Sequence, residues 1–391
     1  MSRKARWEYV RAVHRRYGKA SKSDKQVILD EFCSNSGYNR KYAIRLLNGP
    51  PPEKRPPTRR RRAAEYGTGV IRLLTVIWEA AGYPWSVRLK AVVPLWLPWI
   101  RKRLHPDAAT EKKLLRISSA TMDRQLKPKR RLLRKRQYGR TKPGTLLKHQ
   151  IPIKTDSWDV KEPGFVEVDL VSHSGNCGDG EFIHSLNMTD IHTGWVETRA
   201  VLGKGQVGIV EAMEQMRQSL PFPLRGIDSD NGSEFINYHL KGYCSRRRIQ
   251  FTRGRPYKKD DNAHIEQKNW THVRRIFGYL RFDTPAVLNQ MNDLYTNELT
   301  VYQNLFQPST KLLRKTRVGS RLRRVYERPK TPLERVRECR QTDRSKLAHL
   351  EQTFKEQDPF ELSRRIDQKV EHIFQKANAR MSPAQPGTSR G

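Results

Sequence analysis

The chain has little cysteine, and its four cysteines lie far apart. Cys33, Cys177, Cys244 and Cys339 form no Cys-x-x-Cys pair and no cluster with histidine. This spacing supports neither a disulfide framework nor a zinc site. Isolated cysteines of this kind suit a reduced, cytoplasmic protein, so we expect that location and no bound zinc.

A long apolar run is also missing. The most apolar segment, residues 87–100, contains Arg88, Lys90, Pro94 and Pro98 and is too short to span a bilayer. The first 20 residues are basic and lack the apolar stretch of a secretory signal. We therefore expect no membrane association, and we expect residues 87–100 to form a buried helix.

Acidic residues are scarce relative to basic ones. The 391 residues include 77 Lys and Arg but only 40 Asp and Glu, which gives a formal net charge of +37. An excess of this size predicts a polyanionic partner. Residues 161–290 are nearly neutral, with 17 basic and 16 acidic side chains. The positive charge therefore lies in the flanks, which argues against a uniformly basic, ribosomal-type protein.

Three carboxylates stand in distinctive sequence contexts. Asp169 lies in an alternating apolar run, residues 165–171, that predicts a strand. Asp230 follows a short predicted strand, residues 224–227, and precedes a predicted helix start. Glu266 lies within a helical pattern, and 35 residues separate it from Asp230.

This order and spacing resemble the Asp, Asp-35-Glu signature of DDE transposases and retroviral-type integrases, including bacterial insertion-sequence transposases. The resemblance covers residues 160–285. It implies an RNase H-like catalytic core with a mixed five-stranded sheet and helices. It also implies that Asp169, Asp230 and Glu266 are catalytic and hold Mg²⁺ or Mn²⁺. Asp228 is a competitor for the second position, but the family places that carboxylate immediately before Asn-Gly, which favours Asp230.

The chemistry explains these residue types. Phosphodiester transfer builds charge on the attacking and leaving oxygens, and Mg²⁺ prefers hard oxygen ligands. The resemblance implies DNA cleavage and strand transfer, with double-stranded DNA as the partner, both element ends and target, and a homo-oligomer on DNA. Two alternatives stay open: an RNase H-like nuclease that cuts without joining, and a DNA-binding regulator with an inactive core.

The regions outside the core suggest DNA-binding modules. Residues 1–49 resemble a helix-turn-helix domain, in which Arg40, Lys41 and Arg45 would face DNA. An ordinary helical hairpin with a solvated basic face is the alternative. Residues 63–137 predict a second helical DNA-binding domain, with Arg124 pointing outward and with Trp85, Trp96 and Trp99 in its core. The remaining expected segments are a Pro/Arg-rich linker at 50–62, a linker at 138–159, and a basic and helical C-terminal region with a disordered tail at 286–391.

The core pattern predicts a hairpin formed by residues 181–190 and 195–201, and helices at 206–219, 234–247 and 263–279. A further strand is expected at 249–252.

On the last of these helices, Glu266 and Asn269 would face the metals, while Trp270 and Val273 anchor the helix. Direct participation of Asn269 in the chemistry is one possibility, and hydrogen bonding within the site is the other. DNA phosphates would be held by basic residues of this region: Lys258, Lys259, Lys268, Arg274 and Arg275.

Overall fold

Two separate hydrophobic cores divide the chain into residues 1–65 and residues 66–391. In this computed structural model, the described residues are 3–50, 65–134, 160–229, 238–253, 268–318 and 321–378. Within these ranges no helix is long and apolar enough to cross a membrane.

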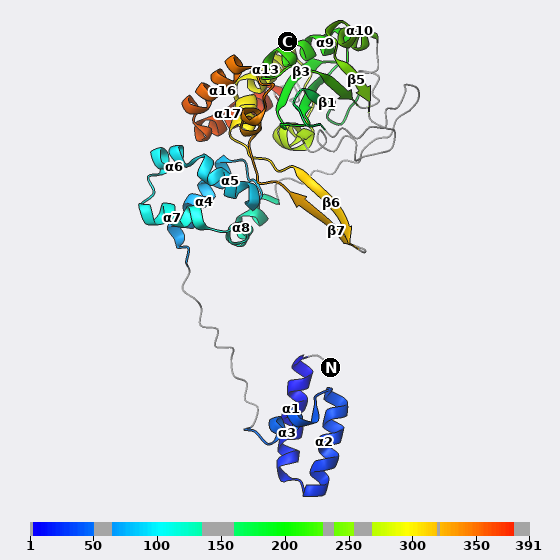
Figure 1. Cartoon of the computed structure of the whole chain (residues 1–391), viewed down its shortest axis with the longest axis vertical. Coiled ribbons are helices and arrows are strands. Elements are labelled where there is room, and N and C mark those ends of the chain that lie inside the picture. Colours follow the sequence, from blue (N-terminus) through cyan, green and yellow to red (C-terminus); the bar gives the residue numbers. More distant parts are fainter. Residues whose placement is uncertain are drawn as a thin grey trace, which may run out of the picture. The chain divides into compact units, whose positions relative to one another are not determined.

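The described residues of the first unit form three helices (Figure 1). They are α1 (Arg3–Lys19), α2 (Lys22–Ser36) and α3 (Arg40–Leu47). Gly37 ends α2 in the left-handed region with φ 71°, and the side chain of Asn39 caps α3 by accepting from the backbone N–H of Lys41. A helix, a glycine turn and a basic helix are therefore present in the expected order.

The second unit begins with five helices around a tryptophan-rich core. They are α4 (Thr68–Ala80), α5 (Ser86–Leu95), α6 (Leu97–Leu104), α7 (Ala108–Arg116) and α8 (Ser119–Arg134). Residues 87–100 form parts of two helices, where one was expected. Pro98 lies in the first turn of α6, where its missing N–H and fixed φ are tolerated, so α6 starts as a new helix.

Three tryptophans that were expected in the core of this region differ in their exposure to solvent. Trp96 is fully buried and Trp99 is 9% exposed, as expected for core residues. Trp85 is 73% exposed, so its assignment to the core was wrong. It precedes the first residue of α5 and lies under the guanidinium of Arg130, 5.9 Å from the ring centroid.

A mixed five-stranded sheet follows, as expected (Figure 1). Its strands are β1 (Phe165–Ser172), β2 (Ile183–Asp190), β3 (Val196–Leu202), β4 (Gly226–Ser229) and β5 (Gln250–Arg253). The order is β3-β2-β1-β4-β5, with β2 antiparallel to both neighbours and β4 parallel to β1 and β5. This arrangement fits an RNase H-like core and puts β1 at the centre.

Helices cover this sheet and continue beyond it. Those packed with the sheet region are α9 (Gln206–Ser219), α10 (Tyr238–Arg247), the π-helix η1 (Asn269–Arg274), α12 (Arg275–Phe277), α13 (Pro285–Asp293), the π-helix η2 (Leu294–Leu299) and α14 (Thr300–Leu305). The bounds of α9 agree with the sequence expectation. Its inward face buries Ile209, Met213 and Met216.

The C-terminal part combines a hairpin with three helices. They are β6 (Leu312–Val318), β7 (Arg321–Tyr326), α15 (Pro332–Glu338), α16 (Arg344–Glu356) and α17 (Pro359–Asn378). β6 and β7 pair only with each other and form a separate two-stranded sheet (Figure 1).

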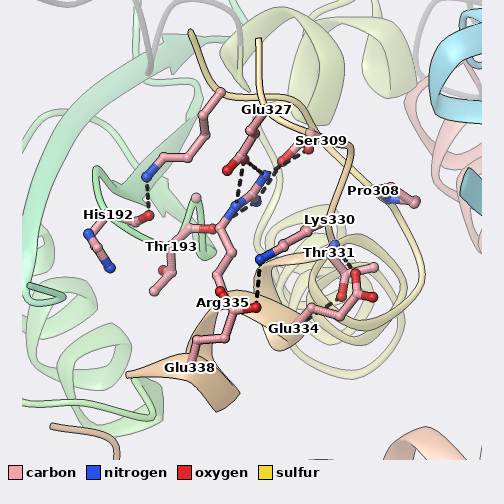
Figure 2. A network of polar contacts seen from close by, with 12 residues as sticks. His192, Thr193, Pro308, Ser309, Glu327, Lys330, Thr331, Glu334, Arg335 and Glu338 are labelled. Atoms are coloured by element: carbon pink, nitrogen blue, oxygen red, sulfur yellow. Dashed lines mark hydrogen bonds and ion pairs between the residues drawn. The ribbon is translucent and has the colours of Figure 1, made fainter. Parts of the chain in front are cut away.

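Arg335 joins α15 to the turn between β2 and β3. Its guanidinium lies between Glu327, Ser309 and Thr193 in Figure 2, and it donates to the Ser309 carbonyl at 2.7 Å, to the Thr193 carbonyl at 3.1 Å and to Glu327 at 2.9 Å. The side chain is buried, so these bonds compensate for the lost hydration of its charge. These bonds attach the base of the β6–β7 hairpin to the five-stranded sheet.

Candidate active site

Asp169 lies on the central strand of the sheet. In β1 it pairs with Asn187 of the antiparallel strand β2. Its carboxylate accepts from the Leu170 N–H at 2.8 Å and from Nδ2 of Asn269 at 2.5 Å. Because Asn269 is the first residue of η1, the sheet and this helix meet at the carboxylate.

A chain of amide hydrogen bonds orients Asn269. Its Oδ1 accepts from Nδ2 of Asn187 at 2.8 Å, and Oδ1 of Asn187 accepts from the Thr198 hydroxyl at 3.3 Å. Asn187 is fully buried. The amide of Asn269 therefore has a defined orientation, with its NH₂ group toward Asp169, which agrees with hydrogen bonding within the site.

The anchoring of this helix differs from the expectation at one residue. Val273 is fully buried, as expected, but Trp270 is 55% exposed, so its role as an anchor was wrong. The reason is the π-helical geometry of η1, because hydrogen bonds from residue i to i+5 widen the turn. Residues that would share a face of an α-helix no longer do so.

The other two expected carboxylates, Asp230 and Glu266, lie outside the described residues, as do Lys258 and Lys259. The description of β4 ends at Ser229, which pairs with Val168 in the parallel register. Among the described residues, no group of three or more His, Cys, Asp or Glu side chains could hold a metal ion.

Lys268 and Arg275, which were expected to hold DNA phosphates, differ in exposure. Lys268 is half-buried, whereas Arg275 is exposed and donates to the Gly82 carbonyl. The ammonium of Lys268 donates to the Gly194 carbonyl at 3.3 Å. Burial, with the charges of Arg88 and Arg335, lowers the pKa of Lys268 to about 7. Contact of Lys268 with DNA phosphates stays a prediction.

Arg274 stays close to the candidate site. Its guanidinium lies 4.7 Å from the ring centroid of Tyr279, and it donates to the Gly278 carbonyl at 3.3 Å. Burial lowers the pKa of Arg274, while the charge of Asp169 raises it. The Asp169 charge therefore acts on a nearby guanidinium that belongs to the same helix as Asn269.

The expected DNA-contact residues of the two helical regions are all exposed. Arg40 forms an ion pair with Asp30, and Arg45 lies 5.3 Å from the ring centroid of Tyr42. Arg124 donates to the Thr121 hydroxyl at 2.9 Å. Their contact with DNA, and that of Lys41, stays a prediction.

A buried histidine lies just beyond β1. His173 is fully buried between Phe277 and Phe282, and its Nε2 is 2.8 Å from the Ser185 hydroxyl. Burial, followed by the charges of Arg274 and His184, lowers the pKa of His173 to about 3. The imidazole is therefore neutral in the folded protein at neutral pH.

This histidine makes stability depend on pH. Between the ordinary pKa of about 6.5 and the folded value, the unfolded chain binds a proton that the folded chain does not, so stability falls as the pH falls. We expect this effect of His173 to make the free energy of unfolding about 2 kcal/mol smaller at pH 5 than at pH 7. His173→Gln should flatten this slope in urea unfolding, whereas His239→Gln, at an exposed histidine of α10, should leave it unchanged. Equal slopes in both variants would contradict the assignment.

No established protein-family model matches the chain. Three solved structures were found to be similar: the catalytic core domain of BIV integrase, the HTLV-2 integrase catalytic core domain in complex with magnesium, and the simian T-cell lymphotropic virus intasome in complex with the PP2A regulatory subunit B56 gamma. Their identities are 18, 14 and 14%, and their TM-scores are 0.25, 0.29 and 0.28. The matches cover 30, 38 and 46% of this chain and 70, 92 and 59% of those chains. Scores this low do not define a fold, whereas the strand order and directions of the sheet do.

One relative is close over nearly its whole length. The uncharacterized protein y4rM of Sinorhizobium fredii is 40% identical over 341 residues, which are 86% of this chain and 96% of that protein. The chain therefore belongs to the same protein family as y4rM.

Proposed function

We propose that the chain is a DDE-type DNA transposase or integrase of the bacterial cytoplasm. It would bind the ends of a mobile element, cut them and join them to target DNA. The observation that carries this proposal is Asp169 on the central strand, held by the first residue of a helix that follows Glu266 in sequence.

The sequence neighbours of the other two carboxylates support a shared site. Asp230 follows Ser229, the last residue of β4, and Ser229 pairs with Val168, the neighbour of Asp169 in β1. Glu266 precedes Asn269 by three residues in the sequence, and Asn269 donates to the Asp169 carboxylate.

Hard carboxylate oxygens fit a divalent cation. Asp169, Asp230 and Glu266 would hold Mg²⁺ or Mn²⁺, which when bound neutralises charge on the attacking and leaving oxygens. Asn269 would keep the Asp169 carboxylate in one orientation. In the reaction, water opens a phosphodiester bond and leaves a 3′-hydroxyl. That hydroxyl then attacks a target phosphodiester, so that one bond forms as another breaks.

The hairpin β6–β7 supports DNA as the partner. Residues 311–330 contain nine Lys or Arg and one acidic residue, Glu327. Arg314, Arg317, Arg323 and Arg324 are exposed. A two-stranded ribbon of this kind fits the major groove of duplex DNA. Its charge would be balanced by phosphates.

Neutralising the hairpin should weaken DNA binding in a salt-dependent way. Each lost phosphate contact reduces the slope of log affinity against log salt concentration by about 0.9. For Arg323→Gln with Arg324→Gln we expect the slope to fall by about 2. Fluorescence anisotropy over a salt series measures this. A control with Arg344→Gln and Arg364→Gln, exposed on α16 and α17, removes the same charge. An equal slope change in both double variants would remove the hairpin from the interface.

The activity test uses the full chain with labelled duplexes from the DNA that flanks its gene. With Mg²⁺ or Mn²⁺ we expect nicked ends and, in the presence of a plasmid, joined products. Nicks without joining would indicate a nuclease. Specific binding of the ends without cleavage under any metal condition would indicate a regulator, and no binding preference for the ends would reject both end-specific functions.

A further inference from the structure

A cavity of about 260 Å³ in the second unit has more basic than acidic side chains in its lining. Its lining includes Arg88 of α5, Lys268, Arg275 of α12 and Asp367 of α17. Three of these four side chains are basic. Lys268, which lines the cavity, directly precedes Asn269 in the chain.

The two guanidinium groups are bound only to neutral partners. Nε of Arg88 donates to the Pro308 carbonyl at 2.6 Å, and Nη2 of Arg275 donates to the Gly82 carbonyl. Neither forms an ion pair within the described residues, and Asp367 forms none with them. The two charges also repel each other, since Arg275 adds to the effect of burial in lowering the pKa of Arg88.

An arginine cannot relieve such a site by losing its proton, because its pKa stays far above neutral. Arg88 is half-buried and Arg275 is exposed, and neither charge is neutralised by an ion pair within the described residues. An anion that enters the cavity would therefore gain the attraction of both groups. The planar guanidinium presents paired N–H donors that match the oxygens of a phosphate. One nitrogen of each group is used on a carbonyl, and the others can donate to a ligand.

We propose that this cavity binds a phosphate group between Arg88 and Arg275. The volume is below the roughly 300–1,000 Å³ of pockets that hold drug-sized molecules, which suits one phosphate better than a larger ligand. The phosphate could belong to free inorganic phosphate or to the end of a nucleic acid strand. Neither source depends on the proposed DNA cleavage, because binding here needs no metal and no catalytic carboxylate.

The test is a titration of the full chain with inorganic phosphate in the presence of EDTA, with sodium chloride at matched ionic strength as the blank. ³¹P NMR or calorimetry should show one saturable site. At a phosphate concentration ten times the dissociation constant, one-site binding should shift the folding equilibrium about elevenfold, which thermal unfolding detects. Arg88→Gln and Arg275→Gln should each weaken binding at least tenfold.

Arg344→Gln, at an exposed arginine of α16 outside the cavity, is the matched control and should bind phosphate like the natural chain. Circular dichroism identifies any variant that does not fold. If one of the two cavity variants does not fold, the other still tests the proposal. Competition with a 5′-phosphorylated oligonucleotide and its unphosphorylated twin separates the sources. Displacement by the phosphorylated strand alone assigns a nucleic acid end, and no displacement by either assigns free phosphate. No saturable binding to the natural chain, or equal binding by the cavity and control variants, overturns the proposal.

Discussion

Replacing Asp169 with Asn is expected to lower DNA cleavage and joining by roughly 10³-fold or more, while DNA binding stays unchanged. The substitution keeps the size of the side chain but removes the negative charge that would hold a divalent cation. The Leu170 N–H and the Asn269 amide donate to different oxygens of Asp169, and an asparagine keeps only one of these two acceptors. One local hydrogen bond is therefore lost together with the charge, and both changes lie at the candidate metal site. The substitution should therefore lower the rate of the chemical step and leave the affinity for DNA unchanged.

The measurement is single-turnover cleavage of labelled ends, together with anisotropy for binding. Glu211→Gln, at an exposed carboxylate on α9, removes the same charge far from β1 in sequence and should keep full activity. If Asp169→Asn cleaved DNA within tenfold of the natural chain, Asp169 would have no catalytic role.

Arg199→Met is expected to produce the largest loss of stability, about 3–5 kcal/mol. On β3, Glu197 is 1% exposed and its carboxylate lies 3.2 Å from Nη1 of Arg199. Without that guanidinium the buried carboxylate keeps the indole N–H of Trp195, at 3.0 Å, but loses the nearest positive charge. Burial already raises the pKa of Glu197, and removing Arg199 should raise it further.

The sign of the pH effect follows from this. In the variant, the folded pKa of Glu197 lies above its unfolded value, so the penalty is present at pH 7 and shrinks as the pH falls. Urea unfolding at pH 7 and pH 5 measures both parts. The double variant Glu197→Gln with Arg199→Met should recover a large share of the loss, because no charge is then left buried. A single-variant loss below about 1 kcal/mol would show that the pair is not coupled as described.

The strand of Asp169 could be predicted from the sequence. Apolar residues alternate there with a period of two, and this pattern predicts both a strand and the face of it that is buried. The bounds of α9 followed from the same kind of periodicity. The partners of Asp169 could not be predicted in this way. Asn187 is one polar residue in a strand, and only the pairing of β1 with β2 places it opposite Asp169.

Local geometry accounts for the sequence expectations that failed. The exposure of Trp270 follows from the π-helix η1, and helical spacing rules assume an α-helix. The half-buried position of Lys268, whose ammonium donates to the Gly194 carbonyl, could not be predicted from the sequence, and its contact with DNA stays a prediction. Trp85 was expected in the core of the helical region, but it stands before the first turn of α5 and is 73% exposed.

The most direct test of the central claim is a crystal structure of the full chain with Mn²⁺ and a duplex of its own end. The anomalous signal of manganese locates the ions independently of the protein atoms. We predict manganese bound by Asp169 and Asp230, with the Glu266 carboxylate at the same cluster and the amide of Asn269 still bonded to Asp169. Carboxylates of these three residues more than about 10 Å apart, too far for ions that lie about 4 Å from each other, would contradict it.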